Sequence, residues 1–425
     1  MLKITHINET HRRTFGIMVR IHRLRQGLTL RRLATRSGLS HTLLNRMELG
    51  NATITHDNYQ KLTDALGVVF LHDIKKNRVF SGMRDRVHDA LFYAETPKVD
   101  TWFSMMEESE DYYMRSFCAI DYLLVKIGAY VHIHERNVED VDDAVVWLSQ
   151  VETLLDDEMR MVFSLYRGMH AYLKKDYRGC EAAMRQILDA TRDFRHASLA
   201  EYFLGRAQSE TYRINEANES FARAMQGFEE TTNTRRALYA RMYIAVNQMK
   251  LYEYEEADQA FLYVMRYADA NEMMWLKETA LLHLMLHAML TGDYRRAVEV
   301  SGEVKYRTLQ WYAMVGYAHA RLGDTRRLAK TLKETSKAAP MHDPYRLYET
   351  ALDYVRLYDK NKNQDAEEQG RALQRFYEAA KAANAFFELE LAFEIYRDHL
   401  VSRRRYKDAY LLTREVIDIV QTTMQ

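Results

Sequence analysis

The sequence predicts an all-α protein: a small helical head followed by a long series of helix pairs. Its 425 residues include only three prolines and 16 glycines, so few residues interrupt helices. Leu, Ala, Arg, Glu, Met and Tyr dominate the composition, which favours helix along nearly the whole chain. From residue 141 onward a short pattern recurs at spacings of 31 to 43 residues, which is typical of a helical repeat array.

The head is expected to occupy residues 1–70 and to contain four helices. Ile17, Ile21, Leu24 and Leu28 follow helical spacing, and Gly27 is suited to ending that first helix. Caps for three further helices follow at Thr29, Ser40 and Thr55, and glycines suited to a positive φ follow two of these helices, at Gly38 and Gly67. Leu30, Leu33 and Ala34 are expected to face inward from the second helix, and Leu44 and Met47 from the third.

The charge of the chain is unevenly distributed. Residues 1–70 hold 11 Lys and Arg against four Asp and Glu, a balance of +7 in a chain whose net charge is zero. The remaining residues therefore carry −7, and a basic head on an acidic body indicates a head that binds polyanions. The alternative is a patch that is basic by chance.

Two short helices joined by a tight glycine turn, the second beginning at a capping serine, form a helix-turn-helix. The stretch TLRRLATRSGLSHTLLNRMELGN resembles the Cro and phage-repressor class, also called the xenobiotic-response-element (XRE) class. The resemblance covers residues 15 to 67. It rests on Leu33-Ala34, Ser37-Gly38-Leu39-Ser40 and the run from Arg46 to Gly50.

The resemblance implies that the third helix enters the major groove of DNA. The side chains that it aims at base edges are His41, Thr42, Asn45 and Arg46. Ser40, Arg31 and Arg32 would hold phosphates. The class often begins its second helix with a glutamine that binds phosphate, whereas this chain has Leu30 there. Glu48 is expected to bond within the domain rather than to DNA.

The body, residues 82–425, contains the repeated pattern. A bulky residue is followed three places later by Ala or a near equivalent at positions 141–144, 177–180, 214–217, 254–257, 294–297, 325–328, 363–366 and 406–409. Nine residues before the bulky position stands a small one in most copies: Gly168, Gly205, Ala245 and Gly316. Small residues at these two places let the helices of a pair approach closely.

This pattern resembles degenerate tetratricopeptide repeats (TPR) from about residue 130 to 420, and residues 311–332 are the best copy. The resemblance implies a right-handed α-solenoid whose concave face is lined by the first helix of each pair. Residues 82–130 are expected to add helices that couple the head to the solenoid, and residues 71–81 are expected to be the linker.

The usual inward positions of the first helices predict a peptide-binding surface rich in Met and aromatic residues. These positions are Met169, Tyr172, Tyr202, Arg206, Met242, Val246, Met249, Leu286, Met289 and Tyr317. Asn247 joins them as an amide able to hold a peptide backbone, with a solvated Asn as the alternative. For the whole set the alternative is a register error, in which case these are core residues.

Other chemistry is weakly indicated. His283 and His287 lie four residues apart, as in two-histidine metal sites, but buried structural histidines are the favoured interpretation. Phosphate-loop, dinucleotide and nucleophile motifs are missing, so we expect neither an enzyme nor a cofactor. With two cysteines, no apolar leader and only residues 279–291 as a long apolar stretch, a cytoplasmic protein that does not span a membrane is expected.

The combination of head and body resembles the peptide-pheromone quorum-sensing regulators of Gram-positive bacteria, the Rgg, PlcR, PrgX and NprR group. The resemblance implies a homodimeric transcription regulator that binds a double-stranded DNA operator and is controlled by a short signalling peptide in the solenoid. The alternative is a scaffold whose solenoid holds a protein partner, with no peptide control.

Overall fold

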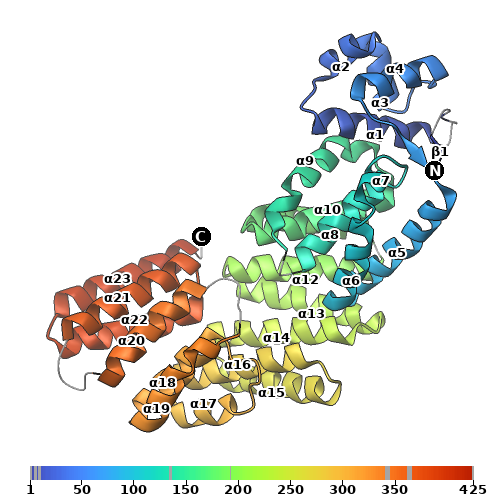
Figure 1. Ribbon diagram of the computed structural model, residues 1–425. Helices are drawn as coiled ribbons and strands as arrows, with labels where there is room; N and C mark the ends of the chain where they lie inside the picture. The colour runs from blue at the N-terminus through green and yellow to red at the C-terminus, as the bar shows by residue number, and fades with distance from the viewer. Residues whose placement is uncertain are drawn as a thin grey trace. The chain divides into compact units, whose positions relative to one another are not determined.

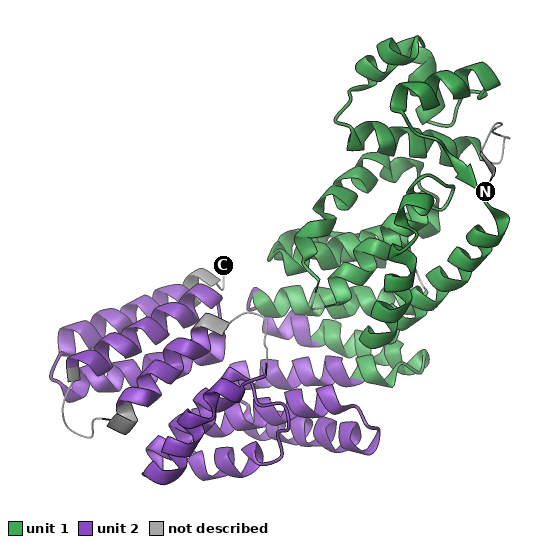
Figure 2. Cartoon of the chain, viewed as in Figure 1, with its two compact units in different colours: residues 1–210, 219–237 green, residues 211–218, 238–425 purple. Residues whose placement is uncertain are grey.

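The computed structural model describes residues 2–3, 7, 11–133, 136–191, 193–339, 345–360 and 366–423. Within these ranges the chain is all-α apart from one short antiparallel pair of strands, β1 (Leu2–Lys3) and β2 (Leu71–His72) (Figure 1). It divides into two compact units, shown in Figure 2. Unit 1 comprises residues 1–210 and 219–237, and unit 2 comprises residues 211–218 and 238–425. The predicted fold class, a helix-turn-helix head followed by a solenoid of helix pairs, is confirmed.

The head consists of α1 (Arg12–Arg25), α2 (Leu30–Ser37), α3 (His41–Glu48) and α4 (His56–Leu66). The predicted caps are present, since the hydroxyls of Thr29, Ser40 and Thr55 each accept a hydrogen bond from a backbone N–H at 3.2 Å. Gly38 ends α2 with a φ of 68°, which turns the chain directly into α3. The head core includes Leu33, Ala34, Leu44 and Met47, as the pattern predicted.

Helices α1 and α3 touch backbone to backbone at Gly16. A Cβ atom at this position would overlap the carbonyl oxygens of Met47 and Glu48, at the end of α3. Only glycine therefore allows α1 to lie this close to α3.

Unit 1 continues from the head through helices that the sequence assigned to coupling and to the first repeats. These are α5 (Ile74–Phe92), α6 (Thr96–Glu107), α7 (Glu110–Met114), α8 (Ala119–His132), η1 (Val138–Val141), α9 (Asp142–Val151), η2 (Glu152–Leu154), α10 (Asp157–Leu173), α11 (Tyr177–Ala190) and α12 (Phe194–Glu210). The segment 71–81, expected as a linker, contains β2 and the beginning of α5.

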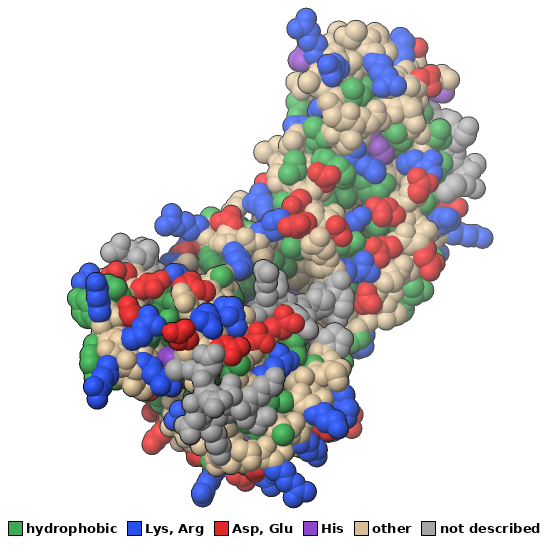
Figure 3. All heavy atoms as spheres, turned by 60° about the vertical axis from the view of Figure 1, so that its left-hand side comes forward, with side chains coloured by type: hydrophobic (Ala, Val, Ile, Leu, Met, Phe, Trp, Pro, Cys, Tyr) green, Lys and Arg blue, Asp and Glu red, His purple; other side chains and the backbone are tan. Residues whose placement is uncertain are grey.

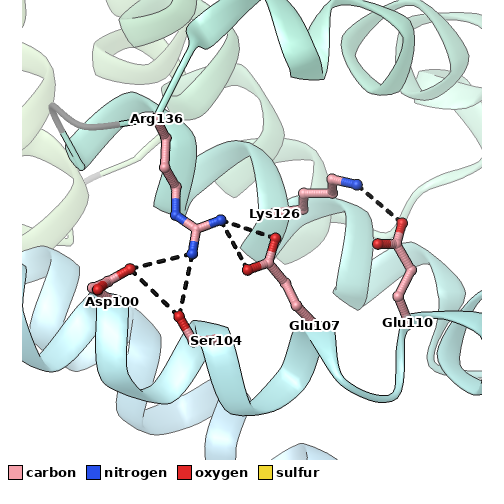
Figure 4. A network of polar contacts seen from close by, with 6 residues as sticks. All are labelled: Asp100, Ser104, Glu107, Glu110, Lys126 and Arg136. Carbon is pink, nitrogen blue, oxygen red and sulfur yellow. Dashed lines mark hydrogen bonds and ion pairs between the residues drawn. The ribbon is translucent and has the colours of Figure 1, made fainter.

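A polar network holds the segment after α8 against α6 (Figure 4). Arg136 donates to Glu107 at 2.9 Å, to Asp100 at 3.2 Å and to Ser104 at 3.3 Å. Beside it, Lys126 of α8 donates to Glu110 of α7 at 2.9 Å. Three helices at the start of the body are thus tied together by charge-assisted hydrogen bonds.

The boundary between the units falls within α13 (Ile214–Glu230) and α14 (Thr234–Lys250). Unit 2 continues with α15 (Tyr254–Ala270), α16 (Met274–Leu290), α17 (Tyr294–Ser301), α18 (Leu309–Arg321), α19 (Thr325–Lys333), η3 (Thr335–Lys337), α20 (Tyr345–Lys360), α21 (Ala366–Ala383), α22 (Phe386–Ser402) and α23 (Tyr406–Thr423). An apolar core extends through the described residues of this unit, from Leu238 to Leu412.

The repeated sequence pattern marks the start of the second helix of each pair. Val141 precedes α9, and the bulky positions 177, 214, 254, 294, 325 and 406 begin α11, α13, α15, α17, α19 and α23. In the copy at 363–366, residues 363–365 lie outside the described residues, and Ala366 begins α21. A Cβ on Gly168 would meet Met184 and Ala183 of α11, which confirms that the small residue permits close approach.

Most turns within the helix pairs share one backbone conformation. One turn residue has a positive φ at Lys175, Tyr212, Tyr252, Gly292, Gly323 and Arg404. In three of these turns the following aspartate, Asp176, Asp293 or Asp324, caps the second helix at 2.9–3.1 Å. The repeats therefore share the turn geometry even where the turn residue is not glycine.

Among the described residues, no helix combines the length and hydropathy that crossing a membrane requires.

We expect Gly16→Ala to destabilise the head by about 1–3 kcal/mol, because the added methyl group would push α1 away from the carbonyls of α3. Hydrogen exchange of the α1 to α4 amides in the full chain measures this. Gly82→Ala is the matched control, since a Cβ there meets nothing within 4 Å. It should leave stability unchanged or raise it by up to about 1 kcal/mol. Equal protection in the two variants would contradict the packing argument.

Candidate nucleic-acid interface

The recognition helix α3 has one buried and one exposed side. Leu44 and Met47 are buried in the head core. His41, Thr42, Asn45 and Arg46, the four side chains assigned to base edges, are all exposed. The helical period alone produces this division, because residues three or four apart share a face. The structure thus brings the four assigned residues together on one solvent-facing surface.

Arg46 is partly held by its own domain. One guanidinium nitrogen, Nη2, donates to the carbonyl oxygen of Asn51 at 3.2 Å, just beyond the end of α3. A guanidinium has five N–H donors in a planar fork, so this bond restrains the side chain and leaves donors for another partner.

The three residues assigned to phosphates flank the turn before α3 or begin α2. Arg31 and Arg32 are exposed in the first turn of α2, and Ser40 is exposed at the cap of α3. The departure at Leu30 has a structural reason, because its side chain packs against the head core. Arg36 is also exposed, one turn after Arg32 on α2, and the spacing of four was a signal that the sequence reading left unused. In Figure 3 Lys and Arg side chains project from the head end of unit 1.

A buried ion pair fixes the position of α3 within the head. Glu48 accepts from Nε of Arg23 at 2.7 Å and from Nη2 at 2.9 Å, and both side chains are buried. The same guanidinium donates through Nη1 to the carbonyl of Leu28 at 2.9 Å, just before α2. The expectation that Glu48 bonds within the domain is confirmed.

The opposite side of α1 packs against the first helices of the body, all within unit 1. Phe15, Met18 and Val19 belong to the head core, whereas Ile17 and Ile21 are buried outside it. Helix α1 contacts α9 there.

Polar contacts reinforce this junction between the head and the body. His22 donates through Nε2 to the carbonyl of Met114 at 2.8 Å, and Arg13 donates to the carbonyl of Leu155 at 3.3 Å. Arg25 lies 5.4 Å from the ring centroid of Trp147. The head is therefore docked on the body rather than tethered to it, which the sequence did not indicate.

Helix α5 is anchored at both ends. At its start, the backbone N–H of Asp73 donates to the hydroxyl of Tyr112 at 3.0 Å, and the carboxylate of Asp73 caps the helix. At its end, Arg236 donates to the carbonyls of Leu91 and Phe92 at 2.6 and 2.7 Å. Asn233 also donates to the carbonyl of Phe92, at 2.6 Å. A buried cation at the carbonyl end of a helix is favoured by the helix dipole.

The residues expected to line an open peptide surface are mostly core residues. Eight of them are buried. Two lie in unit 1, Met169 and Tyr202, and six in unit 2, Met242, Asn247, Met249, Leu286, Met289 and Tyr317. Tyr172, Arg206 and Val246 are half-buried, and the Arg206 guanidinium stacks 4.1 Å from the Tyr172 ring centroid. Most of the inward positions chosen from the repeat register thus pack against neighbouring helices, as the alternative interpretation has it. Leu286, Met289 and Tyr317 also line a small pocket of unit 2, and Met169 lines a groove of unit 1. That any of them binds a peptide stays a prediction.

Three polar residues singled out in the body have structural partners. Asn247 is fully buried and donates to the side chain of Asn218 at 2.8 Å, so it is not a solvated Asn. His283 stacks on Phe261 with 5.1 Å between ring centroids, and burial lowers its pKa to about 4. His287 bonds to Asp258 at 2.6 Å. No group of three or more potential metal ligands occurs among the described residues.

The exposed recognition helix and the stacked helix pairs define a helix-turn-helix protein with a helical-repeat body. Residues 14–69 match the helix-turn-helix domain family. No curated protein sequence matches the chain. Solved structures with the same fold include the apo form of the quorum sensor NprR from B. thuringiensis, with 15% identity and a TM-score of 0.58, covering 82% of this chain and 100% of that one.

Two further structures resemble the chain. A Rap protein complexed with Competence and Sporulation Factor has 13% identity and a TM-score of 0.62, covering 81% of this chain and 98% of that one. NprR in complex with its cognate peptide NprX has 15% identity and a TM-score of 0.53, covering 80% and 99%. These likenesses establish the fold that the repeat pattern predicted.

Acid should weaken the junction between the head and the body through His22. Burial lowers the pKa of His22 from 6.5 to about 4, so the unfolded chain binds a proton that the folded chain excludes. The contribution of neutral His22 to the unfolding free energy is therefore fully present above pH 6.5, and about 3 kcal/mol of it is lost as the pH falls to 4.

The measurement is the unfolding free energy of the full chain against pH, compared with His22→Gln, whose amide retains a donor for the Met114 carbonyl. The variant should lose less stability over this pH range. Parallel pH profiles for the two proteins would rule out this role of His22.

Proposed function

We propose that the chain is a sequence-specific DNA-binding transcription regulator whose TPR-like domain senses a short signalling peptide. The observation that carries the DNA-binding part is the exposed face of α3. All four side chains assigned to base edges are exposed there, while their helical neighbours Leu44 and Met47 form the core. The charge of +7 on residues 1–70 adds the attraction to phosphates that such domains need.

In this proposal α3 lies in the major groove and each side chain has a distinct part. Arg46 makes two hydrogen bonds to a guanine, and Asn45 and His41 lie beside it. Thr42 offers a hydroxyl to a base edge or a methyl group to thymine. Arg31, Arg32 and Ser40 contact phosphates and fix the register of the head on the duplex.

The peptide-sensing part is supported by the shared fold. NprR is described with its cognate peptide NprX, and a Rap protein with Competence and Sporulation Factor. A peptide controls DNA binding only if it binds one arrangement of the protein more tightly than another. The docking of α1 and the anchoring of α5 offer a physical route from the peptide to the head. A movement of the first repeats of unit 1 would displace the helices that contact the head. A differential affinity of a few kcal/mol is enough.

We further propose that two copies act together. Helix-turn-helix heads commonly read paired half-sites, and a two-fold symmetric dimer places two heads for this purpose.

The alternative function, a DNA-tethered scaffold for a protein partner, is favoured by one surface of unit 2. Tyr263 of α15 and Met274 and Trp275 of α16 are exposed by 49%, 44% and 60%. The guanidinium of Arg241 lies 4.7 Å from the ring centroid of Tyr263. Trp, Tyr and Arg are the residues that most often dominate the energy of protein interfaces.

Arg46→Ala should remove preference for one base pair while leaving salt-dependent DNA binding in place. The loss of a bidentate contact to guanine reduces discrimination by about 1–3 kcal/mol, or roughly 5- to 150-fold. Arg31→Ala is the matched control, since loss of a phosphate contact should weaken all sequences alike and lower the salt slope by about one. Unchanged preference of Arg46→Ala in a binding-site selection would refute the base contact.

The experiment that separates the two functions is selection of bound DNA from a random pool by the purified full chain. It is run with and without the small-peptide fraction of spent culture medium. A paired motif whose recovery changes with the peptide fraction supports the peptide-sensing dimer. A motif that is indifferent to every peptide fraction retains the DNA-binding head and favours the scaffold.

A further inference from the structure

Unit 1 contains a groove whose lining includes one of the predicted peptide-binding residues, Met169. It has a volume of about 510 Å³ and is lined by residues 84–92 of α5, 121–132 of α8, 156–169 at and within α10, and 195–199 of α12. An apolar pocket of unit 2, lined by residues of α16, α18, α20, α21 and α22, has only about 30 Å³, which is room for one water molecule. The unit 1 groove is large enough for several side chains of a peptide.

The charge of this groove is negative. Its lining includes five carboxylates, Asp85, Asp89, Asp121, Asp156 and Glu158, and two guanidinium groups, Arg84 and Arg195. Both cations are already engaged. Arg84 pairs with Asp85 at 2.9 Å and with Asp121 at 3.4 Å, and Arg195 pairs with Asp89 at 2.7 Å.

Two of these carboxylates are left without a cation. In the part of the chain that the structure describes, no Lys or Arg pairs with Asp156 or Glu158, at the start of α10. The negative charge of Asp156 also affects the pKa of Asp121, another carboxylate of the groove lining. Burial raises the pKa of Asp121, the Arg84 guanidinium lowers it, and the carboxylates of Asp156 and Asp85 raise it again. Negative charge is thus concentrated at the end of the groove where α8 and α10 begin, and a positive charge placed there would be attracted to it.

The rest of the lining is apolar or neutral. Met159 and Val162 are half-buried on α10, and Leu124, Leu165 and Leu199 are buried around them. His88 supplies no compensating charge near neutral pH, because burial lowers its pKa to about 4 while it bonds to the hydroxyl of Tyr166 at 2.7 Å. The groove therefore combines an acidic end with an apolar wall.

We propose that this groove binds a short peptide that carries one basic side chain among apolar ones, with the basic group beside Asp156 and Asp121. The inference rests on the proposed peptide-sensing function, and adds to it the place of binding and the charge of the ligand. Because the groove is lined by α5, which continues towards the head, its occupant would contact the helix that is anchored at Tyr112 and Arg236.

The test uses the full chain and fluorescein-labelled pentapeptide pools with blocked ends. The central residue of each pool is Lys, Gln or Glu, and the other positions are mixtures of Ala, Leu, Val and Ser. In fluorescence anisotropy titrations the Lys pool should bind about two- to fivefold more tightly than the Gln pool, as expected for a charge pair with the exposed carboxylate of Asp156. The Glu pool should bind more weakly still.

Asp156→Ser is the decisive variant, since serine retains the cap of α10, where Asp156 accepts from the N–H of Met159 at 2.8 Å. It should weaken the Lys pool about two- to fivefold and leave the Gln pool unchanged. The matched control, Asp157→Ser, removes the same charge from a side chain that is 98% exposed and pairs with Arg160 instead. It should change neither pool. Met159→Trp fills the groove and should weaken every pool.

Equal affinity for the Lys, Gln and Glu pools would overturn the inference, and so would equal effects of Asp156→Ser and Asp157→Ser. Either result would leave open peptide sensing at another place on the chain. Failure of every pool to bind also overturns it. In that case the DNA selection with natural peptides decides separately whether the proposed function stands.

Discussion

The arrangement of the molecule depends on the burial of α1 from two sides. One side completes the core of the head, and the other is covered by the first helices of the body. Gly16 and the ion pair between Arg23 and Glu48 set the distance between α1 and α3. Because the same helix is held by the Met114 and Leu155 carbonyls, the direction of the recognition helix is fixed relative to unit 1 and not only within the head.

The body achieves its regularity by contacts that need small side chains rather than particular large ones. Gly168 lets α11 pack closely against α10, and Gly316 lies against Val355 of α20. Residues such as Lys175 and Tyr252 occupy a left-handed backbone conformation that costs an ordinary side chain about 1 kcal/mol or more. That these turns persist without glycine shows that packing of the helix pairs outweighs the local cost.

Local features of the sequence predicted most of the fold. Caps, positive-φ glycines and each copy of the repeat pattern involve residues close in sequence, so the caps Thr29 and Ser40, the turn at Gly38 and the pairing of helices in the body were predicted correctly. The residues assigned to the exposed face of α3 came from the resemblance to the repressor class, and the helical period explains why they share that face. The burial of the predicted peptide-binding positions did not follow from this period, because an error of part of a turn exchanges a groove position for a core position, as at Met249. The unit 1 groove and the contact of His22 with Met114 join segments far apart in sequence, where no spacing rule applies.

The double anchoring of α5 also bears on how such proteins exchange parts. A recombination event at residues 71–81 would separate Asp73 from Tyr112 and would leave Ile17 and Ile21 of a transplanted head uncovered. A new head would then arrive with an apolar face and no partner surface, which favours aggregation. Viable exchange of DNA specificity is therefore expected to proceed by substitutions on the exposed face of α3, with α1, α5 and α9 inherited as one block.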